Sequence, residues 1–167
     1  MKKISVILIC FFLFSFSACE QTLIEEKDLI QKAREVCSLV NADTVEIQIA
    51  GSHQLNNDVL IWYILGNDFQ GYSYLALEFS RVGSNMFKYI AKYKHIERIS
   101  GLNSLLWKDH YSFMIFNRRC TKLLITENDG HQICIQIAVY PFVYLYTQND
   151  KRLYEYVFLD FEGKVIY

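Results

Sequence analysis

VLIWYIL, residues 59–65, is an unbroken run of seven large apolar and aromatic side chains. A strand with one face in solvent alternates apolar with polar residues, whereas a strand buried on both faces is apolar throughout. Seven residues also suit a strand better than a helix, which is usually longer. The run therefore predicts a central strand with packed side chains on both faces.

The flanking segments have the period-two pattern of half-buried strands. Apolar and polar residues alternate over residues 44–49, and the polar residues 51–58 are predicted to form the next turn. On the other side, residues 66–71 return the chain and residues 72–82 alternate again. These segments predict consecutive antiparallel hairpins around the central strand.

Residues 86–99 fit two structures. As a strand, the segment has aromatic side chains on one face and lysines on the other; as a helix, it aligns Met86, Ile90 and Tyr93. We favour the strand because the alternation is regular. The lysines concerned are Lys88, Lys92 and Lys94. They belong either to a solvated sheet face or to a docking site for an acidic partner or lipid head groups.

The C-terminal half continues as strands separated by turns. The predicted strands are residues 111–116, 121–126, 132–140, 142–147, 153–159 and 164–167. Asn128-Asp129-Gly130 carries the Asp-Gly signal of a tight hairpin, and Pro141 marks a bend, a bulge or an edge because it cannot donate a ladder hydrogen bond. The spacing predicts a mainly β fold, an antiparallel β-sandwich or barrel of about 7–9 strands.

One N-terminal helix is predicted over residues 23–39. Thr22 and Glu25 have the spacing of a capping box, and apolar residues then recur at helical spacing. The alternative is a disordered tether followed by an early strand over residues 35–39.

The chain begins with the plan of a secretory signal. Lys2 and Lys3 precede residues 4–18, which carry no charge, and small residues come just before Cys19. These fifteen uncharged residues are fewer than the ~20 needed to cross a bilayer. A cleaved signal is therefore favoured over a retained transmembrane helix.

FSAC, residues 16–19, resembles the lipobox of bacterial lipoproteins. The resemblance implies a diacylglyceryl group on the Cys19 thiol, cleavage before Cys19 and an N-acyl group on the new amino terminus; no other cofactor is predicted. The chain would divide into a signal peptide (1–18), a lipidated cysteine with a short tether (19–22) and one β-rich domain with its helix (23–167). Because Glu20 replaces the Asp typical of inner-membrane retention in enterobacteria, the resemblance implies an outer-membrane protein facing the periplasm.

Charge and cysteine content narrow the partners. Without Lys2 and Lys3, 15 basic and 18 acidic side chains remain, which gives no electrostatic footprint for nucleic acid. In the oxidising periplasm one disulfide is plausible. We prefer Cys37 with Cys120 and keep Cys134 as an alternative partner; the three cysteines can also be small buried apolar residues.

The sequence shows no catalytic or metal-binding pattern. His53, His95, His110 and His131 are scattered, and none has the spacing of a paired-ligand site. P-loop, dinucleotide-binding and nucleophile-elbow motifs are missing from the sequence. We therefore expect neither a metal site nor an enzyme, although catalytic groups can assemble from distant positions.

Aromatic stripes are the remaining signal. Tyr144 and Tyr146 belong to a stripe with even spacing, which is typical of a sheet core. If the stripe faces outward, these tyrosines are candidates for partner binding, because tyrosine on a rigid sheet is typical of protein-binding surfaces.

These features favour a membrane-anchored, non-catalytic protein-binding module. The lipobox, the short tether, Val36-Cys37 and the alternating residues 43–49 resemble small periplasmic lipoproteins that act as immunity proteins against type VI secretion effectors. That resemblance implies inhibition of a secreted toxin. Two alternatives stay open: a structural accessory lipoprotein of an envelope secretion or assembly machine, and a hydrolase or small-ligand carrier with an enclosed pocket.

Replacing Cys19 by serine tests the anchor. Cys19→Ser removes the thiol that would carry the diacylglyceryl group, so we expect the protein to lose its lipid mass and leave the membrane fraction. Intact-mass spectrometry and fractionation measure this, and Cys10→Ser is the matched control that should change neither. A wild-type chain found in the cytosol, or one whose mass globomycin does not change, would contradict the prediction.

Overall fold

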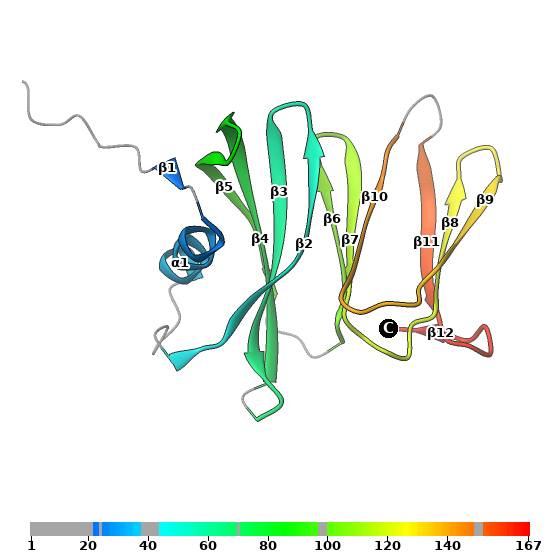
Figure 1. The fold of residues 1–167 in the computed structure, drawn as a ribbon. Helices are drawn as coiled ribbons and strands as arrows, with labels where there is room; N and C mark the ends of the chain where they lie inside the picture. The colour runs from blue at the N-terminus through cyan, green and yellow to red at the C-terminus, as the bar shows by residue number, and fades with distance from the viewer. Residues whose placement is uncertain (1–21, 24, 38–43, 70, 97–99, 149–151) are drawn as a thin grey trace, which may run out of the picture.

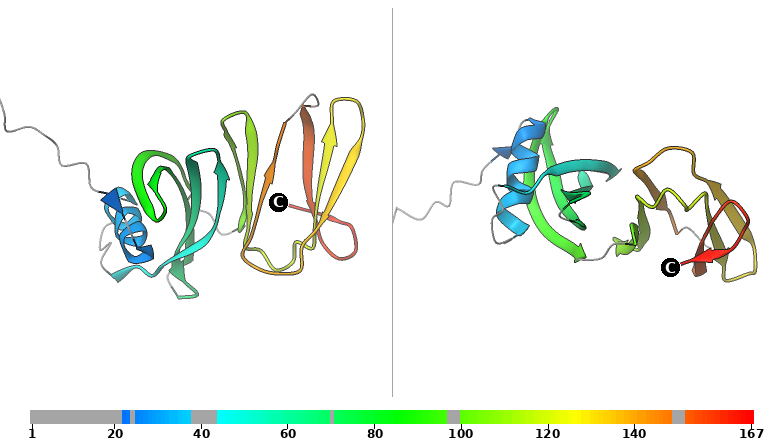
Figure 2. Two further views of the ribbon diagram at one scale, coloured as in Figure 1. Left: turned by 45° about the horizontal axis from the view of Figure 1, so that its top comes forward. Right: turned by 90° about the horizontal axis from the view of Figure 1, so that it is seen from below.

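The computed structural model describes residues 22–23, 25–37, 44–69, 71–96, 100–148 and 152–167. In this part of the chain, one helix, α1 (Glu26–Cys37), and twelve strands are present. The strands form three antiparallel sheets, which stack in a row with α1 at one end (Figures 1 and 2). The predicted mainly β, antiparallel class with an N-terminal helix is confirmed.

The strands are distributed unevenly over the three sheets. In sheet A the order is β1 (Thr22–Leu23), β5 (Met86–Ile96), β4 (Gly71–Gly83), β3 (Asp58–Asn67), β2 (Ile47–Leu55). In sheet B it is β10 (Phe142–Tyr146), β7 (His110–Ile115), β6 (Leu102–Trp107). In sheet C it is β12 (Val165–Ile166), β11 (Leu153–Leu159), β8 (Lys122–Glu127), β9 (Gln132–Gln136).

The apolar run forms β3, and its seven side chains are all buried, as predicted. Odd-numbered residues such as Tyr63 pack in a first hydrophobic cluster, together with the buried face of α1. Even-numbered residues such as Trp62 pack in a second cluster with Trp107 and Met114 of sheet B. Sheet A is therefore covered on both faces, by α1 on one and by sheet B on the other.

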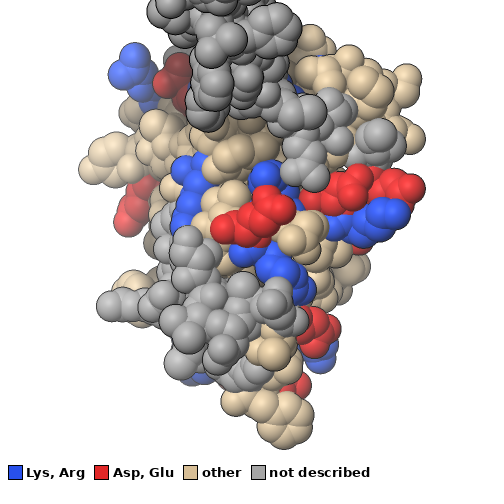
Figure 3. All heavy atoms as spheres, turned by 90° about the vertical axis from the view of Figure 1, so that its left-hand side faces the viewer, with Lys and Arg blue, Asp and Glu red and all other residues tan. Residues whose placement is uncertain are grey.

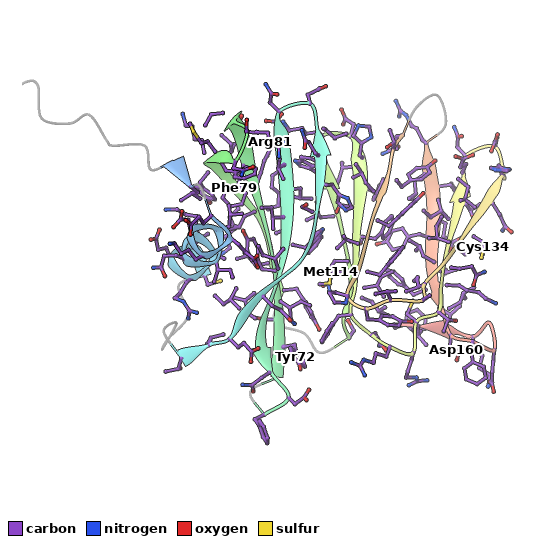
Figure 4. The ribbon with its side chains drawn as sticks, viewed as in Figure 1. Tyr72, Phe79, Arg81, Met114, Cys134 and Asp160 are labelled. Carbon is purple, nitrogen blue, oxygen red and sulfur yellow. The ribbon has the colours of Figure 1, made fainter. Side chains whose placement is uncertain are left out.

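Sheet B repeats this arrangement on a smaller scale. Met114 of β7 packs in the second cluster, whereas its neighbours Phe113 and Ile115 point the other way, into a third cluster shared with sheet C. Figure 4 shows Phe79 and Met114, which belong to the first and second clusters. After β7 the chain enters sheet C for β8 and β9, returns to sheet B for β10, and ends in sheet C. The layers are thus α1, sheet A, sheet B and sheet C.

Two of the twelve strands, β1 and β6, were not predicted, so the expected strand number was too low. Thr22, assigned to the tether, lies in β1, which pairs with β5, and Leu23 is fully buried. The helix consequently begins later than residue 23. The Glu25 carbonyl accepts the first helical hydrogen bonds, and the Asp28 carboxylate accepts one from the Glu25 N–H at 3.1 Å. The predicted capping box at Thr22 and Glu25 does not start the helix; one half of such a box, the bond to Asp28, lies three residues later. Residues 38–39 lie outside the described part.

The predicted turn over residues 51–58 is mostly strand. β2 continues to Leu55, and the register shift next to Gly51 marks a bulge. A Cβ atom on Gly51 would lie 2.3 Å from Cγ2 of Val143 in β10. Glycine is therefore required there because sheets A and B approach each other too closely for any side chain.

One hydrogen bond crosses the second cluster. The Trp62 Nε1–H donates to Ser112 Oγ at 2.7 Å, and neither residue is exposed. This bond joins β3 to β7 and fixes how sheets A and B align, because neither polar atom can turn to water instead.

A double-mutant cycle tests this bond. We expect Ser112→Ala and Trp62→Phe each to lower the free energy of unfolding by about 1–3 kcal/mol, the former because it leaves the indole N–H buried without its partner. The double variant should show a coupling of about 1 kcal/mol, measured by urea denaturation. Strictly additive losses would show that the bond does not stabilise the fold.

Candidate functional site

The predicted lysine cluster is divided between the two faces of β5. Bulges in the pairing with β4 place Lys92 opposite Leu77, on the side of α1, where its Nζ donates to the Val36 carbonyl at 3.4 Å. Lys88 lies opposite Ser80, on the other face. The side chain of Lys94 lies outside the described part. The prediction that the lysines share one face is therefore wrong, because the bulges change the alternation.

The face that carries α1 has mixed charge. Figure 3 shows basic and acidic side chains interleaved there, and the described ion pairs include Lys27 with Glu25 and Lys32 with Glu35, at 2.7 and 2.5 Å. Interleaved charges do not favour one sign of partner. This face is therefore a weak candidate for an electrostatic docking site.

The aromatic stripe of β10 faces the core. Tyr146 is buried, and its hydroxyl donates to Glu127 Oε1 at 2.7 Å; burial and this bond raise the pKa of Tyr146 to about 12. Tyr144 is half-buried, and its ring lies parallel to that of Phe142, with centroids 6.5 Å apart. The outward-facing interpretation of these tyrosines was wrong, since they pack between sheets B and C.

The three cysteines in the described part of the chain, Cys37, Cys120 and Cys134, are free thiols. Cys37 is buried in the first cluster and Cys120 in the third, so the preferred Cys37–Cys120 disulfide is not formed, and the layer between them explains why. Burial raises the pKa of both thiols. Cys134 is exposed on β9, at the end of the stack far from α1 (Figure 4). Cys19 lies outside the described residues.

Chemistry-bearing side chains are dispersed. The described residues contain no group of three or more His, Cys, Asp or Glu placed to hold a metal ion. His53 is the most perturbed histidine described: burial lowers its pKa to about 4, and its Nε2 has no hydrogen-bond partner in the structure. In the same part of the chain, no helix is long and apolar enough to cross a bilayer.

A partly exposed ion-pair network, which the sequence did not reveal, joins sheet A to sheet B; of its three residues only Glu78 is buried. Lys108 lies with Asp109 in the two-residue turn between β6 and β7, and both have positive φ, of 47° and 65°. Its Nζ pairs with Asp58 of β3 and lies 3.0 Å from Oε1 of Glu78 in β4. Glu78 is almost fully buried, and its carboxylate contacts both the Lys108 ammonium and the Tyr93 hydroxyl, which compensate for the loss of water. The contacts of Lys108 with Asp58 and Glu78 therefore hold sheet A to sheet B, and we call this set of three residues the clasp.

One groove lined by described residues lies beside the start of α1. The helix groove, as we call it, has a volume of about 430 Å³ and includes Glu25, Glu26, Gln54, Arg81 and Phe87 in its lining. Arg81 lies over the Phe87 ring, 5.7 Å from its centroid, and contacts Gln54 at 3.3 Å. Arg81 and Gln54 of the helix groove therefore bind each other rather than a ligand. The carboxylates of Glu25 and Glu26, at the start of α1, disfavour the binding of an anion in this groove.

A second groove lies between sheets B and C. We call it the edge groove; its volume is about 320 Å³, and β6, β11, β12 and the C-terminal residue line it. The lining residues are Leu102, Tyr156, Val157, Phe158, Val165, Ile166 and Tyr167. Every one is apolar or aromatic, so the groove suits apolar side chains rather than a charged substrate.

The edge groove exists because the third cluster is only partly closed. In the first cluster, twelve buried residues have six half-buried neighbours, whereas in the third, seven buried residues have eleven. Four of those eleven, Leu102, Tyr156, Phe158 and Ile166, line the groove. The core between sheets B and C is therefore open to solvent along this edge.

Three exposed rings lie on or next to the C-terminal strands, and one of them, Tyr167, also lines the groove. Tyr154, Phe161 and Tyr167 are 76%, 76% and 96% exposed, and all belong to β11, β12 or the segments next to them. Large exposed rings are costly in water and are typical of protein-binding surfaces. Together with the edge groove they make the outer end of the stack the best candidate site.

Comparisons with protein-family models, with curated proteins and with solved structures found no match to this chain.

The clasp gives a stability prediction. Lys108→Met removes the cation and leaves Glu78 charged and buried, so we expect the free energy of unfolding to fall by about 1–3 kcal/mol, discounted because Lys108 is 39% exposed. Adding Glu78→Gln should restore part of the loss. Chemical denaturation measures both, and Lys164→Met, which breaks only the exposed pair with Glu162, is the control. Equal losses for Lys108→Met and Lys164→Met would contradict the clasp.

Proposed function

We propose that this chain is a lipid-anchored protein of the outer membrane that binds a protein partner in the periplasm without catalysis. The observation that carries the proposal is the open third core at the end of the stack. An apolar groove with exposed rings on the same C-terminal strands and turns has the composition of a protein-binding surface, and its lining has no converging polar groups for catalysis.

The anchor and the binding surface would lie at opposite ends of the stack. Only Glu20 and Gln21 separate Cys19 from β1, which belongs to sheet A on the side of α1. The three residue steps from Cys19 to Thr22 span at most about 11 Å, so a lipidated Cys19 would hold α1 and sheet A near the membrane. Sheet C lies at the far end of the layers (Figure 1). The groove would then face the periplasm, where a soluble partner arrives.

Inhibition of a secreted toxin is the form of this function that we favour. The rigid stack, with two sheets buried on both faces, offers a surface that needs little ordering when it binds. A partner blocked in this way would be neutralised by coverage of its surface rather than by chemistry, which agrees with the dispersed polar groups described above.

The test combines binding and protection. With the full chain as bait, we expect one dominant, stoichiometric partner from envelope extract, and cells lacking the gene should become sensitive to neighbouring cells that deliver that partner. Cys19→Ser should still bind the partner in vitro but protect cells poorly, because the anchor and the binding surface are separate. A chain that captures no stoichiometric partner would contradict the binding function. A captured partner that is not toxic would support the binding function but contradict the inhibition of a toxin.

A further inference from the structure

We propose that the uncovered edge of β11 binds an extended segment of the partner as an additional strand of sheet C. The proposal rests on the binding function proposed above and specifies how its site works. The segment would alternate apolar residues, which enter the edge groove, with basic residues, which face solvent.

The backbone of β11 is unpaired along most of one edge. Its other edge pairs with β8 except at Tyr154, where the register shifts, but on the groove side β12 pairs only with Phe158 and Leu159. In the described part of the chain, residues 153–157 therefore have no strand partner on that side. An uncovered strand edge presents N–H and C=O groups at the spacing that another strand requires. The unpaired backbone groups of residues 153–157 can therefore bind a peptide in the extended conformation.

The groove beside this edge matches the inner side chains of such a strand. Tyr156 and Phe158 point into the third cluster, opposite Ile125 and Leu123 of β8. An added strand would place every second side chain beside them, on the open rim that includes Leu102. The 320 Å³ of the groove is near the lower end of the ~300–1,000 Å³ range of ligand pockets, which fits a few aliphatic side chains.

The walls of the groove are held in place before binding. Ser104 Oγ of β6 lies 2.5 Å from the Tyr156 hydroxyl of β11, a hydrogen bond that joins sheet B to sheet C. The Tyr156 ring also contacts the Phe113 ring edge-on, with centroids 4.9 Å apart. A groove that is already formed costs less ordering on binding, which favours a short segment.

Charge specifies the outer side chains of the segment. Glu155 is exposed on β11, opposite Thr126 of β8. It shares the outer face of sheet C with Val157, which lies at the rim of the edge groove, because both alternate with Tyr156. Opposite charges on adjacent strands attract, and like charges repel. A lysine or arginine next to Glu155 therefore fits this edge, and an acidic residue does not.

Hydrogen-exchange mass spectrometry with a synthetic probe tests the proposal. The probe is a peptide of about seven residues that alternates valine and lysine, added to the full chain purified in mild detergent. We expect it to slow exchange at residues 153–157. Two further probes carry N-methyl groups on either the odd-numbered or the even-numbered amides. We expect only one of them to bind and slow exchange, because only one set of amides faces β11.

Matched variants locate the site. Val165→Arg places a charge in the groove, whereas Val139→Arg makes the same change at a residue that is 70% exposed and outside it. We expect Val165→Arg to weaken probe binding at least about tenfold and Val139→Arg to leave it unchanged. Glu155→Lys should reverse the charge preference, favouring a probe of alternating valine and glutamate. Thermal melts identify any variant that fails to fold, and Glu155→Lys tests the site independently of groove packing.

The remaining outcomes separate this inference from the binding function. Protection elsewhere, no protection, or equal binding of both N-methylated probes would overturn strand addition. Protection of residues 153–157 that rises with protein concentration, without probe, would assign the edge to a second copy of this chain and also overturn it. If a natural partner binds Val165→Arg as tightly as the wild-type chain, the groove is not its binding site, and only the binding function is kept. If the probe binds but no natural partner is found, strand addition is kept and the binding function is rejected.

Discussion

Both faces of β3 must be covered, because large side chains point alternately to each side along residues 59–65. This constraint produces the layered architecture. The odd-numbered side chains of β3 are covered by α1. The helix in turn buries Leu29, Ala33 and Cys37 against them. The even-numbered side chains require sheet B, and the Trp62–Ser112 bond and the Lys108 clasp fix the alignment between the two sheets. The rest of the stack extends from this doubly buried strand.

The burial of the sheet faces becomes less complete from sheet A to sheet C. Sheet A is closed on both faces and sheet B is nearly closed, but the core between sheets B and C has a half-buried rim. The reason is the length of the strands: β12 has two residues and leaves most of the β11 edge without a partner. An edge that a monomer leaves open at an apolar core is either an aggregation risk or a site for another strand. Its position at the opposite end of the stack from α1 and β1 favours the second interpretation.

The sequence predicted the strands with regular alternation well and those with irregularities poorly. β3, β4 and the β8–β9 hairpin at Asn128–Gly130 follow from apolar runs and turn residues. The bulges in β5 and at Gly51 changed which side chains share a face, and no local pattern announces a bulge. The misassigned lysines and the missing disulfide have the same origin, because both depend on which layer a residue joins. Tyr146 was ambiguous because a stripe of rings has one pattern whether it faces a core or a partner.

By itself, the sequence determined the secondary structure class and the doubly buried strand. Each of these depends on properties of neighbouring residues: hydrophobicity, charge and spacing. Only the tertiary structure decided that the sheets stack in a row, that Glu78 is neutralised by Lys108, and that the β11 edge borders an open core. Those features join residues 30 to 60 positions apart, and their energies depend on burial and distance, which exist only after the chain has folded.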